Sequence, residues 1–111
     1  MASVYLESII NHFGINMTYK LPVLYSRADA KQRREVREQY IQQQNGLCYW
    51  CNCSLDAAPP KEITSKKINW RLFPPNFLRY PVHLQHNHGT DLTEGAVHAY
   101  CNAVMWQYHG R

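Results

Sequence analysis

The chain has 111 residues, a length that allows one small domain with a modest hydrophobic core. Hydrophobic residues make up 45% and charged residues 18% of the chain, a balance that excludes wholesale disorder. The formal net charge of +4 is a mild bias towards polyanions such as nucleic acid.

The first residues, MASVYLESIINHFG, do not have the form of a signal peptide, because they lack a basic n-region and Glu7 and His12 interrupt the apolar part. No apolar run approaches the ~18 residues that a membrane span needs. We therefore expect a cytoplasmic protein. Its thiols would stay reduced, so the cysteines of CYWC would serve as ligands or redox groups rather than as a disulfide.

Residues 1–45 are expected to form an N-terminal helical segment. Apolar residues between Val4 and Phe13 recur with helical spacing, and Gly14 would end that helix. Residues 15–25 are apolar and irregular, which is typical of a strand or loop packed on the domain.

The clearest helical pattern covers residues 27–45. Ser26 stands where an N-cap is expected, with Asp29 in the capping-box position. The turn-forming pair Asn45-Gly46 would end the helix.

The two faces of this helix differ in character. Val36 and Tyr40 share one face, which would pack on the core. The opposite face is basic and contains Arg27, Lys31 and Arg34. Two interpretations stay open, a solvated charged face or a stripe that contacts phosphates.

Residues 54–81 are predicted to form a long loop, because Pro59-Pro60 and Pro74-Pro75 interrupt regular structure. Basic and aromatic residues are mixed in it: Lys61, Lys66, Lys67, Arg71 and Arg79 with Trp70, Phe73, Phe77 and Tyr80. This mixture suits a nucleic-acid backbone and stacking on bases. The aromatic residues would equally serve as core for a small domain, and both roles can hold together.

A β-hairpin and a final helix are predicted after Pro81. The runs VHLQH and LTEGAV indicate two strands around the polar turn NHGTD. The stretch HAYCNAVMWQYHG indicates a helix that Gly110 closes.

Two pairs of metal-ligand residues share one spacing. The C-x2-C pair Cys48 and Cys51 follows a tight turn, and His98 and Cys101 repeat the spacing at the start of the last helix. Four nitrogen and sulfur ligands in two such pairs fit a tetrahedral structural zinc site. Cys53 is expected to be a bystander. The alternative, a redox C-x-x-C, lacks the strand-to-helix context of such motifs.

Three of the six histidines lie close together in HLQHNHGT. Alternation along a strand would place His86 and His88 on one side, and His83 on the other. Asn102 follows Cys101 and is rotated from it by about 100° on a helix, so it would face the hairpin while Cys101 faces the zinc. We therefore expect a site that combines a strand histidine with a helix asparagine.

The stretches NGLCYWC, HLQHNHGT and EGAVHAYCNAVMWQYHG together resemble the HNH endonucleases, and more closely the phage recombination endonuclease VII type. In that family a helix leads into C-x2-C, a D-H-x-H segment follows, and G-x-x-C-x-x-C-N completes a zinc site. The likeness covers residues 35–110 loosely and 83–102 most specifically. It implies a single α+β domain in which residues 46–111 form a zinc-bound ββα-metal core.

Carried over by residue, the resemblance implies that His86 is the general base for the attacking water. Asn102 would coordinate a catalytic Mg²⁺ or Mn²⁺, and His88 would contact phosphate or assist that metal. The structural zinc ligands would be Cys48, Cys51, His98 and Cys101.

Two positions depart from the family pattern. His98 stands where many relatives have cysteine, which zinc accepts readily. Gln85 stands where the family has aspartate, and a neutral amide oxygen binds a hard cation more weakly than a carboxylate. His83, Asp91 and Glu94 are candidates to replace the missing ligand.

The resemblance implies a metal-dependent DNA endonuclease, encoded by a phage and acting in the host cytoplasm on duplex or branched DNA. Cleavage at a junction would require two active sites and hence a homodimer, with the contact in the N-terminal segment. One alternative is a non-catalytic zinc-finger module that binds DNA, which Gln85 favours. Another is a redox protein that uses Cys48 and Cys51.

Overall fold

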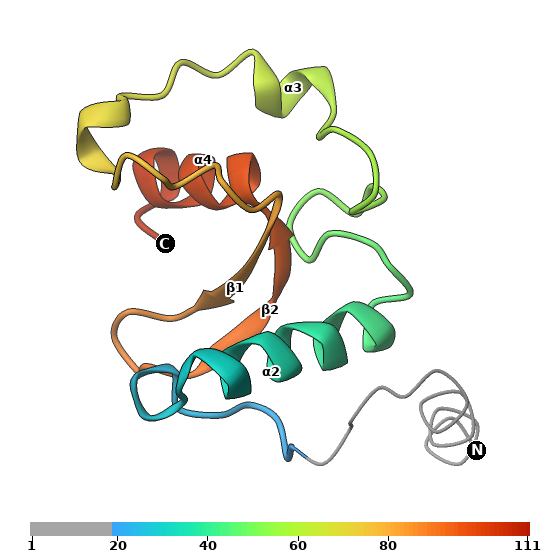
Figure 1. Cartoon of the computed structure of the whole chain (residues 1–111). Coiled ribbons are helices and arrows are strands. Elements are labelled where there is room, and N and C mark those ends of the chain that lie inside the picture. The colour runs from blue at the N-terminus through green and yellow to red at the C-terminus, as the bar shows by residue number, and fades with distance from the viewer. Residues whose placement is uncertain (1–18) are drawn as a thin grey trace.

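The computed structural model describes residues 19–111, so the helix expected over 4–13 lies outside the described residues. Its elements are the 3-10 turns η1 (Tyr25–Arg27) and η2 (Trp70–Leu72), the helices α2 (Ala30–Gln43), α3 (Lys61–Thr64) and α4 (Ala99–His109), and the strands β1 (Val82–His86) and β2 (Thr93–His98). The two strands form an antiparallel hairpin, and Figure 1 shows this hairpin between α2 and α4. The expected α+β class is therefore confirmed.

Helix α2 begins with Asp29 as its N-cap, not with Ser26. The Asp29 side chain accepts a hydrogen bond from the backbone N–H of Gln32 at 2.8 Å, and the Gln32 side chain accepts one from the backbone of Asp29 at 2.9 Å. This reciprocal capping box satisfies two donors at the start of the helix, so the regular turns begin at Ala30 rather than at Arg27. Asn45 and Gly46 adopt positive φ angles of 55° and 74° just beyond the end of the helix, as predicted.

The apolar face of α2 packs on β2, as the sequence predicted. Val36 is fully buried, and Tyr40 is 8% exposed with its hydroxyl 2.9 Å from the hydroxyl of Thr93. From the other direction α4 contributes Met105, which is also fully buried in the same core. The hairpin is thus held between two helices.

The pairing register of the hairpin shifts between Gln85 and His86, where Glu94 of β2 has no partner in β1. Up to that point β1 pairs regularly with β2, with Val82 opposite His98 and Gln85 opposite Gly95. An extra residue of this kind bends its own strand locally. The shift brings His86 opposite Thr93 at the turn end of the hairpin.

The segment that precedes α2 runs along the turn end of the hairpin. The N–H of Thr93 donates to the carbonyl of Val23 at 2.9 Å, and the N–H of Tyr25 donates to the carbonyl of Asp91 at 2.8 Å. These bonds place Tyr25 next to the end of β1, a neighbour that the sequence did not indicate.

The long segment between the two cysteines and the hairpin is mostly irregular, as predicted, apart from α3 and η2. It passes over α4 (Figure 1), where the hydroxyls of Tyr100 and Tyr108 donate to the carbonyls of Lys66 and Lys67 at 2.9 and 2.6 Å. The segment therefore covers one side of α4.

Candidate metal centre and adjoining pocket

The four residues expected to bind zinc converge. The ligand atoms of Cys48, Cys51, His98 and Cys101 all lie within 4.8 Å of one another. The turn after α2 presents the first two, and the junction of β2 and α4 presents the last two. Cys53 lies outside the cluster, with its sulfur 3.6 Å from the carbonyl of Cys51.

The orientation of His98 suits a metal ligand. Its Nε2 lies 2.8 Å from the carbonyl of Ser54 and 2.9 Å from that of Ala57, so Nε2 carries the proton. Nδ1 is then free to donate its lone pair, and it lies 3.4 Å from Cys51 Sγ and 3.6 Å from Cys101 Sγ. Carbonyl acceptors of this kind commonly fix the tautomer of a metal-bound histidine.

The electrostatics of the cluster favour a cation. A hydrogen bond from the thiol of Cys101 lowers the pKa of Cys48, and the same contact together with burial raises the pKa of Cys101. Burial also raises the pKa of Cys51. Cys48 therefore loses its proton readily, and the charge of its thiolate opposes deprotonation of Cys51 and Cys101. A divalent cation removes this repulsion and keeps coordinated thiols deprotonated. The cluster could hold a structural metal ion such as zinc.

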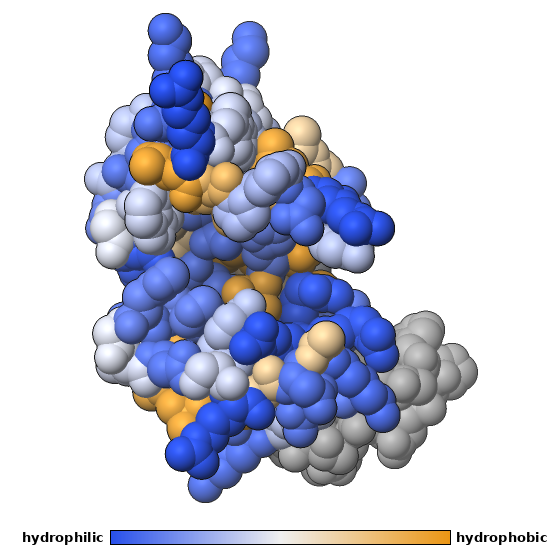
Figure 2. Space-filling model, turned by 60° about the vertical axis from the view of Figure 1, so that its left-hand side comes forward, coloured by the Kyte–Doolittle hydropathy of each residue, from blue (hydrophilic) through white to orange (hydrophobic). Residues whose placement is uncertain are grey.

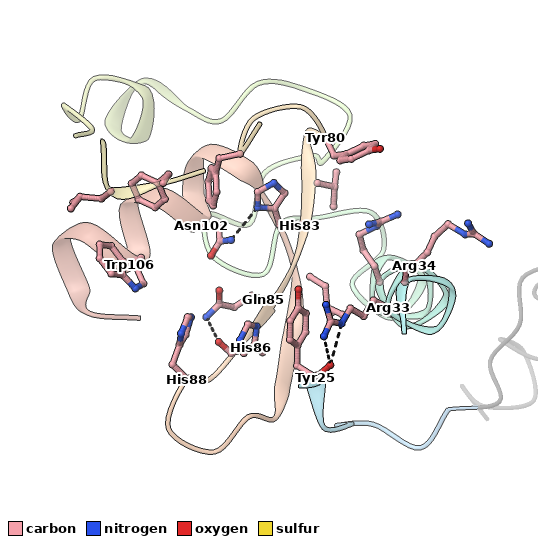
Figure 3. Close-up of a pocket in the computed structure, with 17 residues that line it drawn as sticks. Tyr25, Arg33, Arg34, Tyr80, His83, Gln85, His86, His88, Asn102 and Trp106 are labelled. Atoms are coloured by element: carbon pink, nitrogen blue, oxygen red, sulfur yellow. Dashed lines mark hydrogen bonds between the residues drawn. The ribbon is translucent and has the colours of Figure 1, made fainter. Parts of the chain in front are cut away.

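A pocket of about 600 Å³ opens beside this cluster, between α2, the hairpin, α4 and the segment around Phe73 and Phe77. Figure 3 shows its lining, and Figure 2 shows a hollow on this side of the molecule with hydrophobic side chains within it and mainly hydrophilic ones below. The expected site residues His86, His88, Gln85 and Asn102 all line this pocket.

Gln85 is 2% exposed, and its neighbours determine the orientation of its amide. Its Nε2 lies near three acceptors, the carbonyls of His86 and Arg111 at 3.0 and 3.1 Å and a carboxylate oxygen of Glu94 at 3.3 Å. The nitrogen must face these acceptors, so the amide oxygen is left directed into the pocket.

Asn102 is oriented in the same way by a different neighbour. Its Nδ2 donates to Nδ1 of His83 at 3.1 Å. Burial lowers the pKa of His83, which keeps that imidazole neutral and able to accept. Figure 3 shows the side-chain oxygens of Asn102 and Gln85 pointing towards the same part of the pocket. Oxygen ligands of this kind suit a hard divalent cation.

None of the three candidates to replace the missing aspartate supplies a carboxylate to the pocket, since Asp91 and Glu94 do not line it and His83 is an imidazole. Asp91 accepts hydrogen bonds from the backbone and side chain of Ser26, which lower its pKa. Glu94 accepts from Gln85 and forms a 3.3 Å ion pair with Arg111. His83 holds Asn102, as described above. Each candidate therefore has another partner.

His86 belongs to a stack of rings. Its imidazole lies between the ring of Tyr25, at a centroid distance of 3.8 Å and an angle of 9°, and that of His88, at 4.6 Å and 20°. Burial first, and then the neighbouring charges of His88 and Arg33, lower the pKa of His86. The stack fixes the ring and favours its neutral form.

Two side chains of this stack were missed in the sequence. Tyr25 lies in a segment without a recognisable pattern, and only the fold brings it to His86. The guanidinium of Arg33 lies 3.8 Å above the Tyr25 ring, and its nitrogens donate to the Tyr25 carbonyl at 2.9 and 3.1 Å. The pocket face of α2 carries Arg33, Arg34 and Arg37, whereas the expected stripe members Arg27 and Lys31 do not line the pocket. The spacing of 33 and 37 was a signal that could have identified this face.

The chain matches no protein-family model, and no curated protein or solved structure matches it. Among the described residues, none of the helices is both long and apolar enough to cross a membrane. A functional assignment therefore depends on the residues and geometry of this chain.

Proposed function

We propose that this chain is a metal-dependent DNA endonuclease of the HNH type, in which β1, β2 and α4 form the ββα-metal unit. The observation on which this rests is the convergence on one pocket of a stacked imidazole, His86, and two amide oxygens directed into it, from Gln85 and Asn102. The adjoining Cys48, Cys51, His98 and Cys101 would hold a structural zinc ion.

The roles of the residues follow from their surroundings. Neutral His86 would accept the proton of the water that attacks the phosphorus, and the Tyr25 and His88 rings would keep its plane fixed. The oxygens of Gln85 and Asn102 would hold a Mg²⁺ or Mn²⁺ ion, whose charge stabilises the transferring phosphoryl group and the leaving oxygen. His88, at the open end of the stack, would contact phosphate.

A plasmid assay tests this proposal. Supercoiled DNA is incubated with the protein and Mg²⁺ or Mn²⁺, and nicked product is measured on a gel. We expect His86→Ala and Asn102→Ala to abolish nicking. His109→Ala is the matched control, because this exposed histidine at the end of α4 lies outside the pocket. If all three variants nick the plasmid as the wild type does, the assignment is rejected, because such nicking would come from a contaminating nuclease.

A second candidate function is a non-catalytic zinc-containing module that binds DNA. Gln85 favours it, because this residue and Asn102 offer only neutral amide oxygens to a cation and none of the described lining residues offers a carboxylate. Retarded mobility of the DNA without nicking, in the wild type and in His86→Ala alike, would support this function. A redox role of Cys48 and Cys51 instead predicts that the purified chain contains no zinc by elemental analysis.

A further inference from the structure

The two walls of the pocket differ in chemistry. Helix α2 supplies three arginines, Arg33, Arg34 and Arg37, and the opposite wall supplies Phe73, Phe77 and Trp106. Figure 3 shows Arg33 and Arg34 on one side and Trp106 on the other, with His86 and Asn102 between them. A ligand that fills this pocket must therefore offer both negative charge and flat apolar surface.

Charge complementarity favours a polyanion. Three arginines and three histidines line the pocket, and no aspartate or glutamate is among the described lining residues. Arg34 is exposed, so its guanidinium is available to a ligand. Positive side chains along one wall, with no carboxylate among the described lining residues, attract the phosphates of a nucleic-acid strand.

The aromatic wall is a connected set of rings. Trp106 and Phe73 meet at a centroid distance of 5.6 Å and an angle of 71°, and Phe73 and Phe77 at 4.7 Å and 51°. Phe77 in turn contacts the ring of His83 edge-on at 4.6 Å. These contacts fix the rings, yet Trp106 remains 41% exposed at the pocket. Phe73 and Phe77 are partly buried by these contacts, whereas the indole of Trp106 stays open to solvent.

A stacked duplex cannot use such a wall, because each base face is covered by the next base pair. Bases of an unpaired strand have free faces and stack on exposed aromatic side chains with little dependence on sequence. A pocket of about 600 Å³ also has the size of a small-ligand site rather than of a duplex groove.

We propose that the pocket binds a DNA strand whose bases are unpaired next to the scissile phosphate, with the phosphates along Arg33, Arg34 and Arg37 and the bases against Trp106 and Phe73. This inference extends the proposed endonuclease function by naming its substrate class. Its test measures binding alone, so it can fail or succeed independently of cleavage.

The experiment uses fluorescence anisotropy of a labelled oligothymidine of about ten nucleotides, and of a duplex of the same length. No divalent cation and no chelator is added, so cleavage is prevented and the metal cluster is left intact. We expect the wild type to bind the single strand more tightly than the duplex, with quenching of tryptophan fluorescence.

Trp106→Leu should weaken binding of the single strand by about 5- to 150-fold, the loss expected for one stacking contact, and should leave duplex binding unchanged. Trp106→Phe should restore most of the affinity, because it restores a stacking face. Tyr108→Leu is the matched control, since Tyr108 lies on the same helix, is 46% exposed and does not line the pocket.

Arg34→Gln should weaken binding of both DNA forms and reduce the slope of log affinity against log salt by about one. Lys31→Gln removes an equal charge from the same helix outside the pocket. It should change the affinity and the salt slope less than Arg34→Gln does.

The proposal is overturned if the duplex binds at least as tightly as the single strand, or if Trp106→Leu and Tyr108→Leu have the same effect. Cleavage without this preference would leave the endonuclease function standing and reject the substrate class.

Discussion

Replacing Cys101 by serine tests whether the Cys48, Cys51, His98 and Cys101 cluster supports the fold through a bound metal. Serine has nearly the same shape but does not supply the soft thiolate that zinc prefers. Cys101 is fully buried where α4 begins, so the substitution removes a ligand without disturbing the surface. We expect the variant to lose the metal and, with it, cooperative folding.

The magnitude follows from what else joins the cysteine turn to β2 and α4. The N–H of Tyr49 donates to the Ala96 carbonyl at 2.9 Å, and His98 bonds two carbonyls. Such bonds contribute about 0.5–1.5 kcal/mol each, so three contribute less than about 5 kcal/mol. Structural zinc binding contributes about 10–16 kcal/mol, as much as or more than the about 5–15 kcal/mol net stability of a whole domain. Metal loss should therefore unfold this part of the chain.

The assay combines zinc content by a colorimetric chelator with thermal melting by circular dichroism. Wild type should contain one zinc ion per chain and melt cooperatively, and Cys101→Ser should do neither. Cys53→Ser is the matched control, since Cys53 is a partly buried thiol beside the cluster but not in it. The reasoning is refuted if the metal-free protein melts at the same temperature as the wild type, or if Cys53→Ser loses zinc as Cys101→Ser does.

Four further outcomes are expected. Gln85→Leu keeps the side-chain size but removes the amide oxygen, and it should raise the Mg²⁺ concentration for half-maximal nicking by roughly tenfold; an unchanged metal titration would contradict the proposed cation site. Burial lowers the pKa of His86 below its ordinary 6.5, so the nicking rate should be level above that pH and fall only at lower pH, as the base becomes protonated. Tyr25→Ala should expose the imidazole of His86, raise its pKa and move the fall in rate to higher pH. A pH–rate profile identical to that of the wild type would exclude the ring stack as the cause of the lowered pKa. Gly95→Ala should lower the free energy of unfolding by about 1–3 kcal/mol in urea titrations, because its Cβ would lie 2.8 Å from the Tyr49 ring, and full stability would show that the cysteine turn can move aside.

The features that could be predicted from the sequence are those fixed by local spacing. The two pairs with x2 spacing give the metal cluster, and the 3.6-residue period places Val36 and Tyr40 in the core. Gly110, at φ 67°, ends α4 as expected, because a left-handed residue is the usual helix stop. Each of these features needs only a few consecutive residues.

The features that were not predicted depend on contacts between distant parts of the chain. Ser26 is a chemically suitable cap, but it bonds Asp91 in the hairpin turn, and Asp29 takes the helix end instead. Tyr25 reaches His86 only because the same turn holds the segment before α2. No local sequence pattern predicts such pairings, since the two partners are far apart in the sequence.

Adjacent positions on α4 serve two different tasks. Cys101 belongs to the metal cluster, and its immediate neighbour Asn102 faces the pocket. One extra residue between them would turn the amide by about 100° around the helix axis while leaving the cluster assembled. The direction of the amide relative to the metal cluster therefore depends on this one peptide link.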